Sequence, residues 1–181
     1  MIKWPEIFRK KVDYNLILLL FSVGYYSIII FLAWYLNITE DDAYSLHTSS
    51  KNLSYAWNQS LNFESQPPVY FLLLTIWRVF SDSILWARLL SITLIILSQF
   101  ILLRFLKERS SIKIANISSA LFILNPVIIF TCFEIRLFAL LIFLATSAII
   151  YFLNTYHSNS ITVKSRLIFI LLAIAGLFTQ Y

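Results

Sequence analysis

Three consecutive carboxylates, Glu40, Asp41 and Asp42, follow the first long hydrophobic segment of this chain. The chain has 181 residues but only nine acidic ones, so a third of them lie in this triplet. Adjacent like charges repel each other unless water, a cation or a chemical function compensates. The triplet is therefore the first place to look for chemistry, at a point where polar groups would meet a lipid boundary.

Four further polar residues suit the chemistry of phosphate esters. A carboxylate can take the proton of an acceptor hydroxyl, and an arginine can hold two phosphate oxygens at once. Adjacent carboxylates such as Asp41 and Asp42 can also hold a divalent cation through oxygen ligands. The residues that accompany the triplet are Gln66, Arg88, Glu134 and Arg136.

Each of these residues also has a simpler explanation. An acidic cluster after a hydrophobic segment is typically a solvated loop, and the two prolines after Gln66 can merely begin a helix. Arg88 can extend toward lipid headgroups, and Glu134 can pair with Arg136 at a turn. The functional interpretation depends on all of these residues lying on one side of a membrane.

The composition predicts an all-α protein that crosses a membrane several times. Hydrophobic residues make up 60% of the sequence and its mean hydropathy is +0.80, whereas soluble domains are roughly 45–50% apolar. A soluble protein of this composition would expose large apolar patches. The 16 Phe, 10 Tyr and 5 Trp residues are typical of lipid-facing helices and their interfacial ends.

Five hydrophobic segments are predicted to span the membrane, for which a helix needs about 20 residues. The run 69–80 is too short and contains Arg78, so we expect it to lie at the interface. The charged residues 134–136 are expected at a hairpin turn, because an arginine inside a span costs about 2.5–3.5 kcal/mol. The predicted spans are residues 14–36, 86–105, 114–133, 137–156 and 165–181, and the outer loop 37–85 is expected to contain juxtamembrane helices.

The charge distribution predicts the orientation of these spans. With a cytoplasmic N-terminus, the cytoplasmic segments 1–13, 104–113 and 157–166 contain ten of the fourteen Lys and Arg residues. Six of the nine acids then lie outside, together with all the candidate site residues. We expect a multi-pass protein of the cytoplasmic (inner) membrane with its polar cluster on the non-cytoplasmic face.

Several classes of function are excluded by the same sequence. Two glycines in the whole chain cannot build a glycine-rich nucleotide loop, and a single cysteine, Cys132, allows neither a disulfide framework nor a CxxC metal site. The net charge of +5 is spread between hydrophobic segments, so nucleic acid is not an expected partner. The run 14–36 exceeds the hydrophobic core of about 7–15 residues that a cleaved signal peptide has, which favours an uncleaved first span.

Four sequence patterns together resemble a known family. They are D-D-A-Y-S-L at 41–46, Q-P-P-V-Y-F-L-L-L at 66–74, W-A-R-L-L-S at 86–91 and F-E-I-R-L-F-A-L at 133–140. In this order and at these spacings they resemble the GT-C membrane glycosyltransferases. The similarity is greatest to the branch of the protein O-mannosyltransferases, lipid A aminoarabinose transferases and rhizobial lipopolysaccharide glycosyltransferases, and it covers nearly the whole chain.

The resemblance implies a transferase that works on the non-cytoplasmic face. Its donor would be a polyprenyl-phosphate sugar, and its acceptor a lipid, a glycan or a protein. Asp41 matches the family's first acid, a catalytic base or metal-side carboxylate, and Asp42 stands where the family has Glu. Gln66 matches a position near the donor phosphate. Glu134 and Arg136 match the motif of the second outer loop, although Ile135 replaces the usual alanine.

Two departures from the family bear on cofactor and length. Thr179-Gln180-Tyr181 resembles a Thr-His-Tyr segment with glutamine in place of histidine, which removes a potential metal ligand. A divalent metal ion, with Asp41 and Asp42 as ligands, is the one cofactor that the sequence suggests. Family members are usually several hundred residues long, so we expect residues 1–181 to be the N-terminal transmembrane part of such an enzyme. Alternatives are a truncated, non-catalytic membrane protein or partner subunit, and a small transporter. Acids outside the spans disfavour the transporter.

Overall fold

The computed structural model describes residues 13–157 and 163–180, and in that part of the chain every regular element is an α-helix. The predicted all-α fold is confirmed. The predicted cytoplasmic segments 1–13 and 157–166, and the last residue of the predicted span 165–181, lie wholly or partly outside the described residues.

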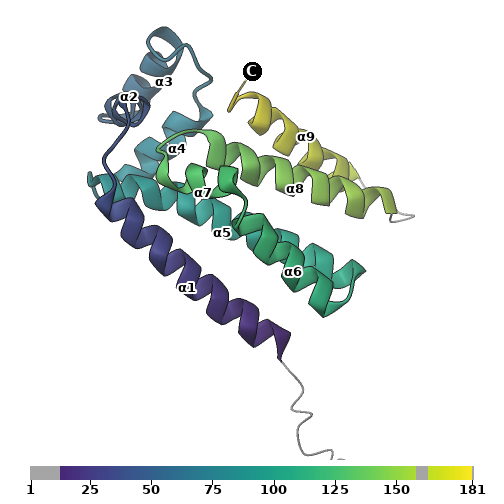
Figure 1. Ribbon diagram of the computed structural model, residues 1–181. Helices are drawn as coiled ribbons and strands as arrows, with labels where there is room; N and C mark the ends of the chain where they lie inside the picture. Colours follow the sequence, from purple (N-terminus) through teal and green to yellow (C-terminus); the bar gives the residue numbers. More distant parts are fainter. Residues whose placement is uncertain (1–12, 158–162, 181) are drawn as a thin grey trace, which may run out of the picture.

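Long helices lie side by side, and three short helices gather at one end of them (Figure 1). These three are α2 (Glu40–Thr48), α3 (Leu53–Asn62) and α4 (Val69–Arg78), whereas the equally short α7 packs against α5 within the bundle. The others are α1 (Tyr14–Tyr35), α5 (Ile84–Arg109), α6 (Ile112–Ile123), α7 (Pro126–Phe133), α8 (Phe138–His157) and α9 (Val163–Leu177).

Within the described residues, three helices are long and apolar enough to cross a membrane, namely α1, α5 and residues 138–155 of α8. A fourth span is present if α6 and α7, which are bent by 52° at the break between them, count as one. The chain is thus a multi-pass membrane protein, but the predicted five spans are not confirmed. The 15 residues of α9 reach only about 22 Å at ~1.5 Å per residue, short of the ~30 Å hydrocarbon core.

The break between α6 and α7 has a local cause. Residues 114–133 were expected to form one span, but α6 ends at Ile123 and α7 begins at Pro126. The Asn125 side chain accepts a hydrogen bond from the Val127 amide at 2.9 Å and so caps α7, where proline occupies the first turn. Across the break, the Tyr25 hydroxyl donates to the Ile123 carbonyl at 2.7 Å, which satisfies a carbonyl at the end of α6.

Helix α5 forms the centre of the bundle. It packs against α1, α4, α6, α7 and α8. Its buried side chains Ala87, Ile92 and Ile95 are at most 1% exposed. In a membrane, helices associate through close van der Waals packing rather than through removal of apolar surface from water, and this packing around α5 positions both ends of the bundle.

Helix α4 was expected at the membrane interface, and its ten residues are indeed too few to span. Its apolar face is not free to contact lipid, however, because Tyr70, Phe71 and Leu74 are buried in the protein core. Trp77 and Trp86 stack on each other, and each indole N–H donates to the other's backbone carbonyl at 2.8 Å. These contacts fasten α4 to the start of α5.

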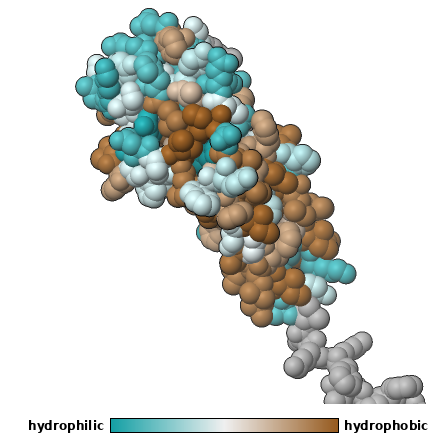
Figure 2. Space-filling view, turned by 60° about the vertical axis from the view of Figure 1, so that its left-hand side comes forward, coloured by the Kyte–Doolittle hydropathy of each residue, from teal (hydrophilic) through white to brown (hydrophobic). Residues whose placement is uncertain are grey.

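The surface divides in the same way as the helices. Figure 2 shows hydrophilic side chains gathered at the end formed by α2 and α3, and hydrophobic side chains along the long helices. The amide of Val69 donates to the Phe178 carbonyl at 3.3 Å, so the end of α9 also reaches the polar end. This end therefore contains the starts or ends of α1, α2, α4, α5, α8 and α9.

Candidate functional site

The acidic triplet forms the first turn of α2, and much of its clustering has a structural reason. Thr39 caps the helix by accepting from the Asp42 amide at 3.2 Å, while Asp42 accepts from the Thr39 amide at 3.1 Å. This reciprocal capping box satisfies two amides that the helix leaves without partners. Acidic residues are also favoured here, because the N-terminus of a helix carries partial positive charge.

Asp42 is wholly buried, with its carboxylate directed into the protein. Besides capping α2, it accepts a hydrogen bond from the Ile135 amide at 2.7 Å, 93 residues away in the sequence. Asp42 Oδ2 also lies 3.5 Å from a guanidinium nitrogen of Arg88. Each carboxylate oxygen is thus engaged within the protein, which makes Asp42 a structural residue in this arrangement.

Arg88 is equally buried, and its guanidinium caps the end of α1. One terminal nitrogen donates to the carbonyls of Ala33 and Leu36, both at 2.7 Å, and the other donates to Asn37 at 2.8 Å. The last carbonyls of a helix lack partners within it and carry partial negative charge. Here α5 supplies the cation, since α1 has no basic residue in its own last turn.

The Asp42–Arg88 pair therefore joins four parts of the chain: the end of α1, the start of α2, the start of α5 and the α7–α8 turn. Both side chains are at most 2% exposed. Asp42 was predicted to be catalytic, with Asp41, and Arg88 was predicted to bind substrate. The position of the pair inside the protein instead suits it to holding that site together.

A second arginine, Arg136, lies in the α7–α8 turn and faces two other carboxylates. One of its terminal nitrogens is 3.8 Å from Asp41 and the other is 3.5 Å from Glu64. These are charge contacts and are too long for good hydrogen bonds. Accordingly, Nε and that second terminal nitrogen of Arg136 have no hydrogen-bond partner within the described part of the chain.

Helix α2 also fixes the position of Glu64. The Thr48 hydroxyl donates to one oxygen of Glu64 at 3.0 Å, leaving the other oxygen toward Arg136. Asp41 differs sharply from its neighbour in sequence, since its side chain is 64% exposed. The result is one solvent-accessible carboxylate and one nearly buried carboxylate on either side of a guanidinium.

Two further buried polar atoms close to this cluster lack partners among the described residues, namely the Tyr70 hydroxyl and Gln66 Oε1. Tyr70 is fully buried within electrostatic reach of Asp42, Arg136, Glu134 and Glu64. Burial raises the pKa of the Tyr70 phenol, so the hydroxyl keeps its proton and can donate it in a hydrogen bond. Unsatisfied buried polar atoms are rare in folded proteins, and several in one region call for a ligand or for water.

The connection between α3 and α4 carries a strained residue next to these groups. Ser65, between Glu64 and Gln66, has a φ of 52°, in the left-handed region. A non-glycine residue there costs roughly 1–2 kcal/mol, and such strain tends to persist at functional sites. The Gln66 amide donates to the Ser60 carbonyl at 2.9 Å, which holds this turn against α3.

Glu134 lies at the beginning of the α7–α8 turn. The Ser91 hydroxyl donates to its backbone carbonyl at 2.7 Å, so α5 holds one side of the turn and Asp42 the other. Partial burial raises the pKa of the Glu134 carboxyl above its usual range, and the charge of Asp42 adds to the effect, while Arg136 opposes it. This carboxyl therefore holds its proton to higher pH than a free glutamate does.

The structure thus brings five of the six predicted residues, Asp41, Asp42, Arg88, Glu134 and Arg136, to one end of the bundle, and Gln66 stands in the adjoining connection. Reasoning from sequence missed Glu64 and Tyr70. Both flank the Q-P-P pattern closely, which was the available signal. It also missed the Thr39-x-x-Asp42 capping box, a recognisable start of a helix.

The carboxylates do not suit a metal ion in this arrangement. Across the described ranges 13–157 and 163–180, no group of three or more His, Cys, Asp or Glu side chains is close enough to hold one. Asp42 already has an acceptor contact on each oxygen, and Asp41 and Glu64 face the cation of Arg136. The metal therefore remains only a sequence-based prediction, and no chemical step below depends on it.

Comparison of the chain with protein-family models, with curated proteins and with solved structures finds no match. The functional interpretation therefore depends on the arrangement of the residues themselves.

Proposed function

We propose that this chain serves the transfer of a sugar from a polyprenyl-phosphate donor to an acceptor hydroxyl, at the end of the bundle where α2, α3 and α4 gather. The observation that supports it is the incompletely satisfied guanidinium of Arg136 between Asp41 and Glu64. Arginine is well suited to bind a phosphate through two parallel hydrogen bonds. Arg136 lies at the polar end of the bundle, and this end adjoins the hydrophobic surface of the long helices (Figure 2), which fits a donor with a lipid tail and a polar head.

In the proposed reaction, the acceptor hydroxyl attacks the anomeric carbon of the sugar. Asp41, the exposed carboxylate, takes the hydroxyl proton as the new carbon–oxygen bond forms. The bond between the anomeric carbon and the phosphate oxygen breaks, and the polyprenyl phosphate leaves with the electron pair. Arg136 balances the charge of that phosphate, and attack from the opposite side inverts the anomeric configuration.

The remaining residues of the proposed site have supporting functions. Gln66 Oε1 and the Tyr70 hydroxyl have no hydrogen-bond partner among the described residues, which makes them candidates for contacts with the sugar or the phosphate. Arg88, first predicted to bind substrate, is assigned to positioning, because its terminal nitrogens already bind the end of α1. Glu134 lies beside Arg136 and can contact substrate, as the sequence predicted.

Membrane orientation belongs to the same proposal. We propose that the protein lies in the inner membrane, with its N-terminus in the cytoplasm and its polar end on the outer side. The basic residues Lys107, Arg109 and Lys113 lie around the α5–α6 turn at the opposite end, and basic residues favour the cytoplasmic side. In a five-span arrangement, α6 with α7 forms one bent span and α9 contributes the last. Labelling of a cysteine placed at exposed Asp82, from outside the cell, tests this orientation.

The binding step can be tested with farnesyl monophosphate, a short polyprenyl phosphate, and with farnesol, which lacks the phosphate. Native mass spectrometry of the full chain measures both. Arg136→Gln should weaken farnesyl phosphate binding about 10- to 100-fold, since hydrogen bonds to charged groups are worth about 1.5–3 kcal/mol. Farnesol binding should stay unchanged, and Arg136→Lys should restore part of the loss.

The matched control is Arg104→Gln, since Arg104 is exposed and pairs with Glu108 within its own helix. It should leave farnesyl phosphate binding intact. Transfer itself is measured with a radiolabelled polyprenyl-phosphate hexose in membrane vesicles, where Asp41→Asn should abolish transfer and Glu40→Gln should not. Near-normal transfer by Asp41→Asn would remove Asp41 as the base. Equal binding of the phosphate and the alcohol would favour a non-catalytic membrane partner.

A further inference from the structure

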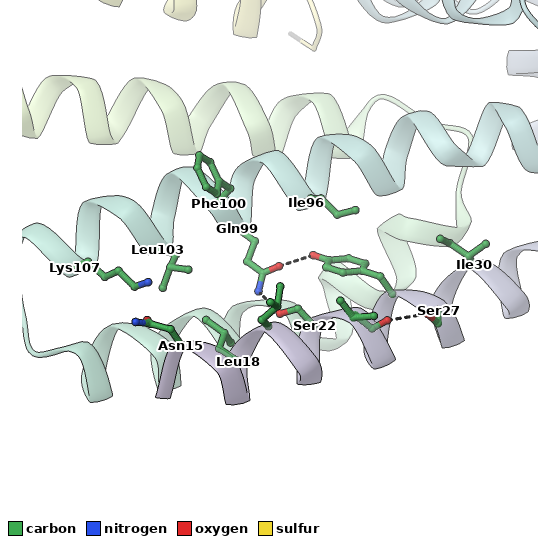
Figure 3. Close-up of a pocket in the computed structure, with 13 residues that line it drawn as sticks. Asn15, Leu18, Ser22, Ser27, Ile30, Ile96, Gln99, Phe100, Leu103 and Lys107 are labelled. Atoms are coloured by element: carbon green, nitrogen blue, oxygen red, sulfur yellow. Dashed lines mark hydrogen bonds between the residues drawn. The ribbon is translucent and has the colours of Figure 1, made fainter. Parts of the chain in front are cut away.

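A groove of about 570 Å³ runs between α1 and α5, away from the polar end of the molecule. Its volume lies within the range of about 300–1,000 Å³ that is usual for small-ligand sites. The walls include Leu18, Val23 and Ile30 from α1 and Ile96 and Leu103 from α5. Figure 3 shows Leu18 and Ile30 along α1 and Ile96 and Leu103 along α5.

The polar groups in the groove are already paired with each other. Gln99 accepts from the Tyr26 hydroxyl at 2.9 Å and donates to Ser22 and Ser119, each at 3.2 Å (Figure 3). Ser27 donates to the Val23 carbonyl of its own helix at 2.8 Å. Because these groups do not need a polar ligand, the middle of the groove suits a hydrocarbon chain.

One end of the groove is different, because Lys107 from α5 and Asn15 from α1 line it together (Figure 3). Both are exposed, and no carboxylate within the described residues forms an ion pair with Lys107. An ammonium group and an amide at the end of an apolar groove are complementary to an anionic headgroup above an acyl chain.

The length of the groove fits one leaflet of a bilayer. Lys107 and Ile96 are eleven residues apart on α5, which is about 16 Å at ~1.5 Å per residue. Half of the ~30 Å hydrocarbon core is about 15 Å. A phospholipid whose phosphate contacts Lys107 would therefore lay its acyl chain along the groove to about the bilayer midplane.

We infer that this groove binds one anionic phospholipid of the leaflet at the Lys107 end, with an acyl chain between α1 and α5 and the headgroup at Lys107 and Asn15. The site is separate from the Arg136 cluster, at the other end of the bundle. The bound chain fills space between two spanning helices that are joined by the hydrogen bonds of Gln99 near the groove and by those of Arg88 at the polar end.

Native mass spectrometry of the full chain in detergent tests this inference, with phosphatidylglycerol and phosphatidylcholine of identical acyl chains as probes. One phosphatidylglycerol should be retained per chain in preference to phosphatidylcholine. Lys107→Gln should weaken phosphatidylglycerol binding about fivefold, the value of one lysine near an anionic surface, and leave phosphatidylcholine binding unchanged. The matched control is Lys113→Gln, since Lys113 is equally exposed at this end but borders a different hollow, between α1 and α6.

A second pair of variants tests the acyl-chain position. Val23→Trp places a large ring in the groove from an exposed position and should abolish retention of both lipids, whereas Leu20→Trp, exposed on the same helix outside the groove, should not. Unchanged melting temperatures show that both variants fold. Equal losses in Lys107→Gln and Lys113→Gln, or undiminished binding in Val23→Trp, would overturn the inference. The inference would also be wrong if the wild-type chain formed a dimer that Val23→Trp dissociates. It would be wrong as well if equimolar farnesyl phosphate displaced phosphatidylglycerol.

Discussion

Arg88 and Arg136 each lie beside one of two consecutive aspartates, yet their surroundings are opposite. Arg88 has three hydrogen bonds to the end of α1 and is almost inaccessible. Arg136 has only long contacts with Asp41 and Glu64, and among the described residues its Nε and one terminal nitrogen have no hydrogen-bond partner, whereas at Arg88 only Nε lacks one. The difference shows that a neighbouring carboxylate does not decide whether an arginine can bind a ligand. What decides it is whether backbone carbonyls already accept hydrogen bonds from the guanidinium nitrogens.

The two aspartates differ because successive residues on a helix point about 100° apart. Asp42 stands at the position that turns inward and completes the capping box, while Asp41 points to solvent. One turn of helix thus contributes a fixed anchor and an accessible carboxylate. The buried, fully bonded Asp42 carboxylate with Arg88 and the Arg136 cluster, in which only Asp41 is exposed and the contacts are long, should therefore respond differently to mutation.

The largest expected difference is in stability. Arg88→Ala should lower the free energy of unfolding by about 3–5 kcal/mol, because it leaves the Asp42 carboxylate buried without its cation and the end of α1 without its cap. Arg136→Ala should cost clearly less, since its contacts are long. Denaturant unfolding in detergent, followed by circular dichroism, measures both. Equal losses for the two variants would contradict the contrast, and Arg104→Ala provides the surface control.

The helical framework could largely be predicted from hydrophobicity. Long apolar runs identify α1, α5 and α8 within a few residues, because a helix is the simplest way to satisfy backbone groups in lipid. The division of residues 114–133 into two helices was not predicted. The Asn125 side chain caps the start of α7, so the chain begins a new helix at Pro126 instead of continuing as one helix with a bend. The exact reach of α9 depends on packing against α8, which one sequence does not reveal.

The candidate site was predictable in place but not in detail. The residues were found from their types and spacing, and the structure brings most of them together. Their division into buried and accessible groups was not predictable, because it depends on contacts such as Asp42 with the Ile135 amide, 93 residues away. Glu64 was overlooked for the same reason, since only the folded chain brings it to Arg136 and Thr48.

A smaller effect should follow from loosening the Arg136 cluster at Thr48. Thr48→Val keeps the shape of the side chain but removes the hydrogen bond to Glu64, so it should cost about 1.5–3 kcal/mol of stability. It should also weaken farnesyl phosphate binding, because Glu64 would no longer hold a fixed position beside Arg136. Thr131→Val is the matched control, since that hydroxyl bonds only within its own helix. Equal effects of the two variants would show that Thr48 does not position the cluster.

The smallest expected effect is a pH dependence of the protein's stability, caused by Glu134 at the α7–α8 turn. Partial burial, with a contribution from Asp42, raises the pKa of Glu134. The folded protein therefore favours the protonated carboxyl. Its contribution to stability is complete below the unfolded value of about 4.3 and is lost as the pH rises through the folded pKa. Relative to Glu134→Gln, the wild-type chain should thus become progressively less stable over that interval.

Melting temperatures in detergent at a series of pH values measure this difference directly. Because Glu134 is only partly buried, solvent limits the size of the effect. Ser91→Ala is the control, since it removes the hydrogen bond to the Glu134 carbonyl without removing a titrating group. Its difference from the wild-type chain should not depend on pH. A wild-type chain that gained stability over Glu134→Gln with rising pH would mean that Arg136 outweighs burial at this carboxyl. The Arg136 cluster would then be a satisfied ion-pair network like that of Asp42 and Arg88.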